Sequence, residues 1–208
     1  QHPKAPRSMA RAFVSSVLGG EPSDTLTTAD LYAGLRLRVA PTTHLVPEEE
    51  EIITSATLHG FTDDTVVTLV LDTEHTIQTM PLDRLREHDD VDTLVRAARN
   101  NLRTELLGID PHAQLHPGSE DHPGARFRSF ESGSYYMATG PVLFPELLDA
   151  WAPDLDHSRG ILFAMPTRHI LLVREISTGE DLLEGLGRLA PVAAQVAVDG
   201  SHSVSPLL

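Results

Sequence analysis

The clearest hydrophobic pattern in this chain is a pair of short apolar runs, residues 161–165 and 170–173, separated by four residues that begin with Pro166. Proline suits the first corner of a tight turn, so the pattern predicts a β-hairpin. Neither run alternates between apolar and polar residues, which is typical of strands that are covered on both faces. We therefore expect this hairpin at the centre of a sheet and of the core.

Other short runs also have the composition of strands. Residues 35–39 alternate between apolar residues and arginine, which predicts a strand with Arg36 and Arg38 on the face towards water. Runs of β-branched and apolar residues bounded by turn-forming residues predict an antiparallel meander and, later in the chain, a further strand pair. These predicted strands are residues 52–58, 65–71 and 76–80, and residues 127–130 with 135–139.

Helical periodicity is strongest between Asp90 and Leu107, where apolar residues recur at three- and four-residue spacing. Asp89 or Asp90 can cap the start of this helix, and Gly108 can end it. Shorter patterns predict helices at residues 8–18, 143–151 and 182–189. The acidic run 48–51 and the proline- and histidine-rich stretch 109–125 have no periodic pattern, so we expect exposed loops there.

These elements predict an α+β fold with a largely antiparallel, twisted sheet and packed helices. At 208 residues the chain can form one large domain without disulfides or structural metals. We expect residues 1–50 to form an N-terminal arm with an accessory helix and strand, and residues 51–208 to form the main domain. Because only 5% of the residues are aromatic, aliphatic side chains must fill the core.

Charge and cysteine content narrow the classes of function. Thirty acidic residues against sixteen basic ones give a formal net charge of −14, which should repel nucleic acids and anionic membranes and favour a basic protein partner. No run of eighteen apolar residues occurs, and the first residues lack the apolar core of a signal peptide. Cysteine is absent, which excludes disulfides, thiolate nucleophiles and cysteine metal sites. We expect a cytoplasmic protein.

The order of these elements resembles that of the YtpQ-like family of bacterial proteins, from residue 52 to the end. The matching pieces are the strand that ends Leu69-Val70-Leu71-Asp72, the helix that ends Ala97-Ala98-Arg99-Asn100-Asn101-Leu102, the segment Tyr135-Tyr136-Met137-Ala138, the hairpin with Met165-Pro166-Thr167-Arg168, and residues 203–208. The resemblance implies a cytoplasmic α+β domain for residues 51–208. The biochemical role of the family is uncharacterised, so it brings no catalytic residues to this chain.

Histidines are the most obvious candidate metal ligands. His112, His116 and His122 lie in the stretch 109–125 beside several carboxylates, and imidazole with carboxylate suits zinc or nickel. His112 and His116 stand four residues apart, a ligand spacing on a helix, whereas Pro111 and Pro117 argue against a helix. The alternative is a solvated loop that binds no metal.

Five further residues are candidates for binding a ligand or a partner. Asn101 borders the buried stripe of the predicted long helix, where its amide either meets a ligand or bridges neighbouring backbone groups. Thr167, Arg168 and His169 form the hairpin corner, where a guanidinium beside an imidazole can hold a carboxylate or phosphate of a ligand or partner. The alternative is a polar tip on an apolar hairpin, with Arg168 paired to one of the chain's own carboxylates. Asp72 ends a strand, where it can serve acid–base chemistry, help to hold a divalent cation or simply favour the turn.

No short catalytic motif occurs in the chain: there is no Gly-x-Ser-x-Gly elbow, no phosphate-binding glycine loop and no His-Glu-x-x-His motif. The first hypothesis is therefore a non-enzymatic binding or adaptor module that needs no cofactor. The alternative is a metal-assisted hydrolase that uses the histidine-rich stretch or the carboxylates near Asp72.

Overall fold

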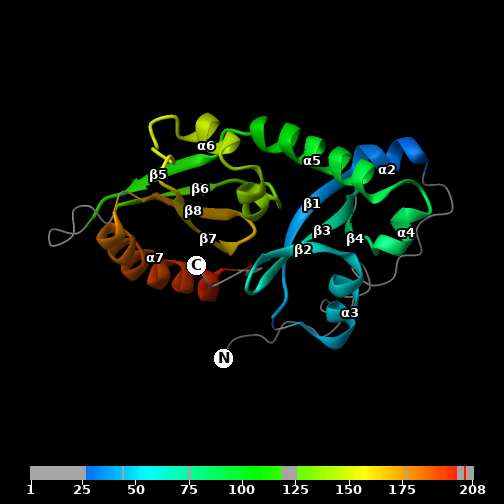
Figure 1. The fold of residues 1–208 in the computed structure, drawn as a ribbon, viewed down its shortest axis with the longest axis horizontal. Coiled ribbons are helices and arrows are strands. Elements are labelled where there is room, and N and C mark those ends of the chain that lie inside the picture. The colour runs from blue at the N-terminus through cyan, green and yellow to red at the C-terminus, as the bar shows by residue number, and fades with distance from the viewer. Residues whose placement is uncertain are drawn as a thin grey trace, which may run out of the picture. The chain divides into compact units, whose positions relative to one another are not determined.

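A computed structural model of the chain describes residues 27–43, 45–74, 76–118, 126–176, 178–200 and Val204 (Figure 1). The chain divides into two compact units: unit 1 is Gln1–Thr62 with Val66–Asn101, and unit 2 is Asp63–Thr65 with Leu102–Leu208. Helices occur together with antiparallel strands in both units, so the predicted α+β class is confirmed. None of the described helices combines the length and the apolar character needed to cross a bilayer.

Unit 1 is built on a four-stranded sheet with the order β1-β3-β2, in which β4 also pairs antiparallel with β3. Its strands are β1 (Leu35–Pro41), β2 (Thr57–Thr62), β3 (Thr65–Asp72) and β4 (Ile77–Thr79), and its helices are α2 (Thr28–Gly34), α3 (Pro47–Ala56), α4 (Leu82–Arg86) and the first part of α5 (Val91–Leu107). In β1 the apolar residues are buried and Arg36 and Arg38 are half-exposed, so the predicted alternation is confirmed. The predicted long helix is confirmed as α5; the Asp90 carboxylate accepts the Thr93 N–H at 2.9 Å and caps it.

Helix α3 overturns two predictions, the acidic loop at 48–51 and the strand at 52–58. Proline at the first helical position and glutamates in the first turn both favour a helix start, because the helix dipole is positive there. The Glu49 carboxylate also accepts the Val46 N–H at 3.2 Å. Ile52, Ile53 and Ala56 then lie on the side of the helix that is wholly or partly buried. The strand of the meander begins only at Thr57.

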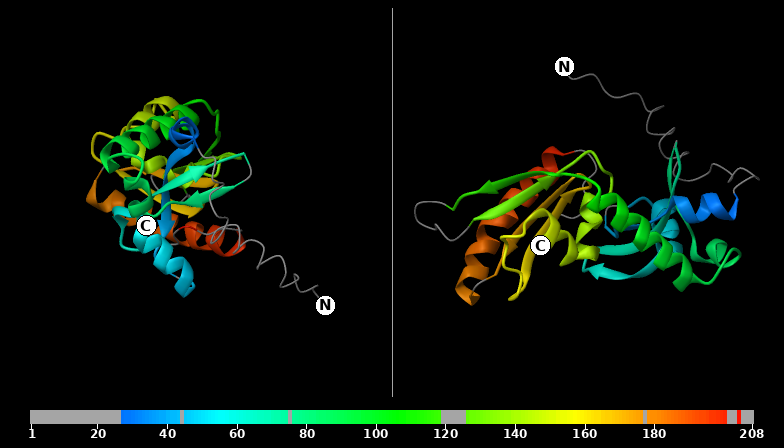
Figure 2. Two further views of the ribbon diagram at one scale, coloured as in Figure 1. Left: turned by 90° about the vertical axis from the view of Figure 1, so that its right-hand side faces the viewer. Right: turned by 90° about the horizontal axis from the view of Figure 1, so that it is seen from above.

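Unit 2 contains a second antiparallel sheet with the strand order β5-β6-β8-β7, and Figure 1 shows these strands side by side in that order. Its elements are β5 (His112–His116), β6 (Phe127–Glu131), the 3₁₀ helix η1 (Met137–Leu143), α6 (Glu146–Trp151), β7 (Ile161–Thr167), β8 (Ile170–Glu175) and α7 (Gly179–Asp199). Helix α7 packs along β7 (Figures 1 and 2). The core between this sheet and α7 includes Phe127, Ala164, Leu172, Leu189 and Ala193, which come from β6, β7, β8 and α7.

The apolar hairpin is confirmed as β7 and β8, but its predicted central position is only half right. Strand β8 lies between β6 and β7, whereas β7 forms an edge of the sheet. Both α7 and η1 contact β7. An edge strand that neighbouring elements cover can carry an unbroken apolar run, because each of its faces meets protein rather than water. The lack of alternation between apolar and polar residues therefore indicated that the strand is covered by other elements, not that it lies at the centre of the sheet.

Two further predictions for unit 2 are wrong. Residues 112–116 form strand β5 rather than part of a loop, since they pair with β6 over their whole length. Most of β5 is exposed, so no buried periodic pattern marked it. Residues 137–143 form η1 rather than a strand, and the Thr139 N–H donates to the Tyr136 carbonyl at 2.9 Å, the bond of a 3₁₀ turn. The helices predicted at 143–151 and 182–189 correspond to α6 and α7, while that predicted at 8–18 lies outside the described residues.

Candidate functional site

The predicted hairpin corner, Thr167 to His169, is an ordered constellation in unit 2. The Arg168 guanidinium carbon lies 4.2 Å from the centroid of the Tyr135 ring, in the geometry of a cation–π contact. The His169 ring lies beside the same tyrosine, with 5.3 Å between centroids. Thr167 is buried, and its hydroxyl accepts the His169 backbone N–H at 3.4 Å. The turn thus presents one guanidinium that contacts both a tyrosine ring and an imidazole.

Hydrogen bonds fix the orientation of both His169 and Arg168. The Arg168 Nε–H donates to His169 Nε2 at 3.1 Å, so that ring nitrogen carries the lone pair. The proton of the neutral imidazole is then on Nδ1, from which it is donated to the Ser134 carbonyl at 3.0 Å. The Ser134 hydroxyl is itself bound to Glu105 at 2.8 Å. Arg168 is held through Nε, and its two terminal nitrogens make no hydrogen bond within the described residues.

The charge of Arg168 is not neutralised by any carboxylate in the described part of the chain. Burial lowers the pKa of its guanidinium, and Tyr135 offsets this shift only in part. Arginine nevertheless stays protonated at neutral pH. The corner therefore holds a partly desolvated positive charge whose orientation is fixed. Two parallel N–H donors on such a guanidinium match the two oxygens of a carboxylate or phosphate.

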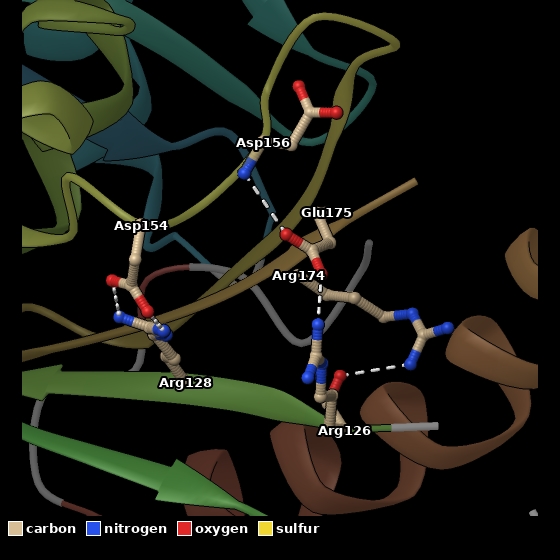
Figure 3. A network of polar contacts seen from close by, with 6 residues as sticks. All are labelled: Arg126, Arg128, Asp154, Asp156, Arg174 and Glu175. Carbon is tan, nitrogen blue, oxygen red and sulfur yellow. Dashed lines mark hydrogen bonds and ion pairs between the residues drawn. The ribbon is translucent and has the colours of Figure 1, made fainter. Parts of the chain in front are cut away.

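A second group of arginines lines a small pocket of about 130 Å³ elsewhere in unit 2. Figure 3 shows Arg126 and Arg128 from the start of β6 beside acidic residues from β8 and from the loop after α6. Arg128 binds both oxygens of Asp154, at 2.8 and 2.5 Å. Arg126 binds Glu175 at 2.6 Å, and the second oxygen of Glu175 accepts the Asp156 N–H at 3.1 Å. Apolar side chains complete the lining: Leu115, Phe127, Leu155 and Val173.

The ion pair between Arg128 and Asp154 shifts the pKa values of both residues. The hydrogen bond to Asp154 raises the pKa of Arg128, and the same bond lowers the pKa of the Asp154 carboxyl. Arg126 and Arg128 each already hold a carboxylate, so an anionic ligand would have to displace Glu175 or Asp154. The network serves instead to attach the loop at 154–156 to β6 and β8. We therefore regard the Arg168 corner as the better candidate site.

Asn101 has a structural role in unit 1. Its side-chain amide donates to the carbonyls of Tyr32 and Leu35, at 2.7 and 2.9 Å, and lies 3.4 Å from that of Ala33. These carbonyls belong to the junction of α2 with β1. The amide thus ties α5 to that junction, which matches the backbone-bridging alternative for this residue. Asp72 is half-buried at the end of β3, in unit 1.

The histidines do not form a metal site within one chain as far as the structure describes it. His112 and His116 lie on a strand, where four residues span about 13 Å, too far for two imidazoles to reach one ion. Within the described ranges, no three acidic, histidine or cysteine side chains come together as a metal site. His122 lies outside the described residues. The prediction of metal binding through these three histidines stays a prediction.

Sequence reasoning named Thr167, Arg168 and His169 but missed Tyr135, whose ring completes the corner. Nothing in the spacing indicates this contact, since 33 positions separate it from Arg168 and an expected strand included it. In the structure Tyr135 is 48% exposed, so no buried apolar pattern could have marked it in the sequence either. The arginines of the pocket were also missed, because arginine at a strand end is common on solvated surfaces.

No protein-family model, curated protein or solved structure matches this chain. The resemblance to the YtpQ-like family therefore stays a prediction, and the function must be argued from the site itself.

Proposed function

We propose that this chain is a non-enzymatic binding module that docks a partner protein, with Arg168 as the residue that engages an acidic group of the partner. One observation carries the proposal: the Arg168 guanidinium is held by Tyr135 and His169, yet no carboxylate of the described residues neutralises it. Partial burial of an uncompensated charge is costly. Since none of the described acidic residues supplies a carboxylate, we take an anion from outside the chain as the partner of this charge.

The chemistry of the partner follows from the net charge of the chain and from the single charge of Arg168. The net charge of −14 attracts a basic protein surface over long range and disfavours nucleic acid. At contact distance, Arg168 selects a single carboxylate on that surface through its two terminal nitrogens. Tyrosine and arginine together are typical of the few residues that dominate the energy of protein interfaces. We place the module in the cytoplasm, in keeping with its lack of cysteine.

The metal-assisted hydrolase is the weaker proposal. The histidines on β5 are spread along a strand rather than gathered at one point, and Asp72 lies in unit 1 whereas they lie in unit 2. A bound metal would be detected by elemental analysis of protein purified without a histidine tag. About one equivalent of zinc or nickel per chain, together with hydrolytic activity that is lost when the metal is removed, would favour the hydrolase.

The binding proposal is tested by quantitative affinity capture from a cell extract at moderate salt, with Arg168→Gln compared against the native chain. Arg84→Gln is the matched control, since it removes the same charge from an exposed position on α4. We expect a defined protein that the native chain and Arg84→Gln both retain. Its affinity for purified Arg168→Gln should be at least about tenfold lower, because a desolvated arginine anchor commonly contributes more than 1.4 kcal/mol.

Capture of the same proteins by all three chains would contradict a role for Arg168, and failure to capture any protein at any salt concentration would contradict the binding function itself. Tyr135→Leu serves as an intermediate variant: it keeps the charge of Arg168 but removes the ring beneath it. We expect a smaller loss of affinity than for Arg168→Gln, since an exposed cation–π contact contributes about 0.5–1 kcal/mol.

A further inference from the structure

Strand β5 forms an edge of the unit 2 sheet (Figures 1 and 2), and among the described strands it pairs only with β6. Residues 112–115 are exposed, including Leu115, which is 52% exposed. The outer edge of such a strand carries backbone N–H and C=O groups that can pair with another strand. No lysine or proline interrupts the strand itself.

The sequence of β5 is nearly symmetric about its central residue. Residues 111–117 read Pro-His-Ala-Gln-Leu-His-Pro. Antiparallel pairing of two copies about a two-fold axis at Gln114 would set equivalent or complementary residues opposite each other, and self-complementarity is what a two-fold interface requires. The opposed pairs are Pro111 with Pro117, His112 with His116, Ala113 with Leu115, and Gln114 with itself.

This pairing changes the distance between the histidines. Along one strand His112 and His116 are about 13 Å apart, whereas residues directly opposite each other in an antiparallel pair have Cα atoms only about 4.5–5.5 Å apart. Both side chains point to the same face of the sheet, since their separation in sequence is even. Two imidazoles at that distance can reach one zinc ion with Zn–N bonds of about 2.0–2.1 Å.

His116 is held in a state suited to metal binding. Its ring stacks on Phe127, with 4.4 Å between centroids, and its Nε2 lies 2.8 Å from the Ser129 hydroxyl oxygen. A metal binds the neutral form of each imidazole. When Nε2–H donates to Ser129, the lone pair is on Nδ1; a hydrogen bond of this kind commonly orients a histidine ligand.

We propose that two copies of this chain pair through the outer edges of β5, antiparallel about Gln114, and that each His112–His116 pair across the interface binds a divalent transition metal such as zinc. The interface would cover Leu115 and use the backbone groups on the outer edge of each β5, which no described strand pairs. The two-fold axis creates two equivalent metal sites per dimer, hence one ion per chain. The proposal is independent of the docking of a partner at Arg168.

The register is tested by disulfide trapping, which is clean because the chain contains no cysteine. Gln114→Cys places its thiol opposite the same position of the second copy, where cross-strand geometry allows a disulfide after a small adjustment. Ala113→Cys is the control, since position 113 opposes position 115. We expect Gln114→Cys to give a covalent dimer under mild oxidation, and Ala113→Cys to remain mostly monomeric. Equal cross-linking of the two variants, or none in either, would overturn the proposed register.

Metal binding is tested by sedimentation velocity of the untagged native chain with added zinc or with EDTA. We expect zinc to raise the dimer fraction at a fixed protein concentration at least about tenfold, and EDTA to reverse this. His112→Ala should lose the response, whereas His88→Ala should keep it, because His88 is an exposed histidine on unit 1. A sedimentation profile that is identical with zinc and with EDTA, or a zinc response that survives His112→Ala, would overturn the metal sites.

Discussion

Replacement of Gly185 by alanine should destabilise unit 2, although alanine is the better helix former. Gly185 lies in α7 against the side chain of Arg174 from β8. A Cβ atom at position 185 would lie 2.5 Å from Arg174 Nε and 2.8 Å from Cδ. Arg174 cannot easily withdraw, since it is 3% exposed and its Nη1 donates to the Arg126 carbonyl at 2.9 Å. Figure 3 shows this side chain extending from β8 towards the helix.

Two opposing effects set the magnitude. Extra volume at a packed position costs about 1–3 kcal/mol, whereas alanine gains up to about 1 kcal/mol over glycine within a helix. Gly187 provides the matched control on the same helix, because a Cβ there would meet no atom within 4 Å. Gly187→Ala should therefore stabilise the protein, and the free energies of unfolding of the two variants should differ by about 1–3 kcal/mol.

Urea unfolding followed by tryptophan fluorescence measures this difference in the right unit. Trp151 is the only tryptophan of the chain and lies in unit 2, with 5.6 Å between its ring centroid and that of Phe130. We expect a lower midpoint for Gly185→Ala and a higher one for Gly187→Ala. If both variants raise the midpoint equally, the contact between Arg174 and α7 is refuted. In an Arg174→Ala background the penalty of Gly185→Ala should shrink, since the obstructing Cδ and Nε atoms are gone.

Three further predictions concern other contacts. Gly34→Ala should destabilise unit 1 by about 1–3 kcal/mol, because the added Cβ would lie 2.7 Å from a carbonyl oxygen of β3. Gly60→Ala is the control, since a Cβ there would meet no atom within 4 Å, and urea unfolding followed by circular dichroism compares the midpoints of the two variants. Asn101→Leu should cost about 1–3 kcal/mol in the same assay, since it leaves carbonyls of the α2–β1 junction without their donor; an unchanged midpoint would show that the amide is dispensable. Burial and the nearby Arg188 guanidinium lower the pKa of His116 in the folded chain. As the pH falls below about 6.5, the unfolded chain therefore takes up a proton at this histidine before the folded chain does, and the free energy of unfolding decreases. His116→Asn should lose less stability than the native chain over this pH range, whereas His88→Asn should lose as much.

How much of the fold could be predicted depended on whether burial follows the sequence period. Helix α5 could be predicted because its buried residues recur at helical spacing, and β1 because its arginines alternate with buried residues. Strand β7 was misplaced because α7 and η1 both cover it, and the sequence shows only that it is covered. Helix α3 was missed because its four consecutive glutamates resemble a solvated loop unless the proline that precedes them is weighed as a helix start.

Candidate sites were predictable only where they were local in sequence. Thr167, Arg168 and His169 are neighbours, so a tight turn was enough to bring them together. Tyr135 joins them because β6 pairs with β8, which places the segment after β6 beside the turn; the Ser132 N–H donates to the His169 carbonyl at 3.2 Å. That pairing is a tertiary fact that residue types in a single sequence do not contain.

The histidines of β5 show why spacing has no chemical meaning until the secondary structure is known. Four residues bring two side chains to about 5–6 Å on a helix, but to about 13 Å on a strand. The same spacing that would chelate a metal on one helix therefore separates the ligands on one strand. Because antiparallel pairing brings opposed residues to about 5 Å, ligands that a strand separates can meet across a symmetric edge. A near-palindrome centred between two histidines is thus a signal for a site shared by two chains, and it is readable only once residues 112–116 are known to be a strand at an edge.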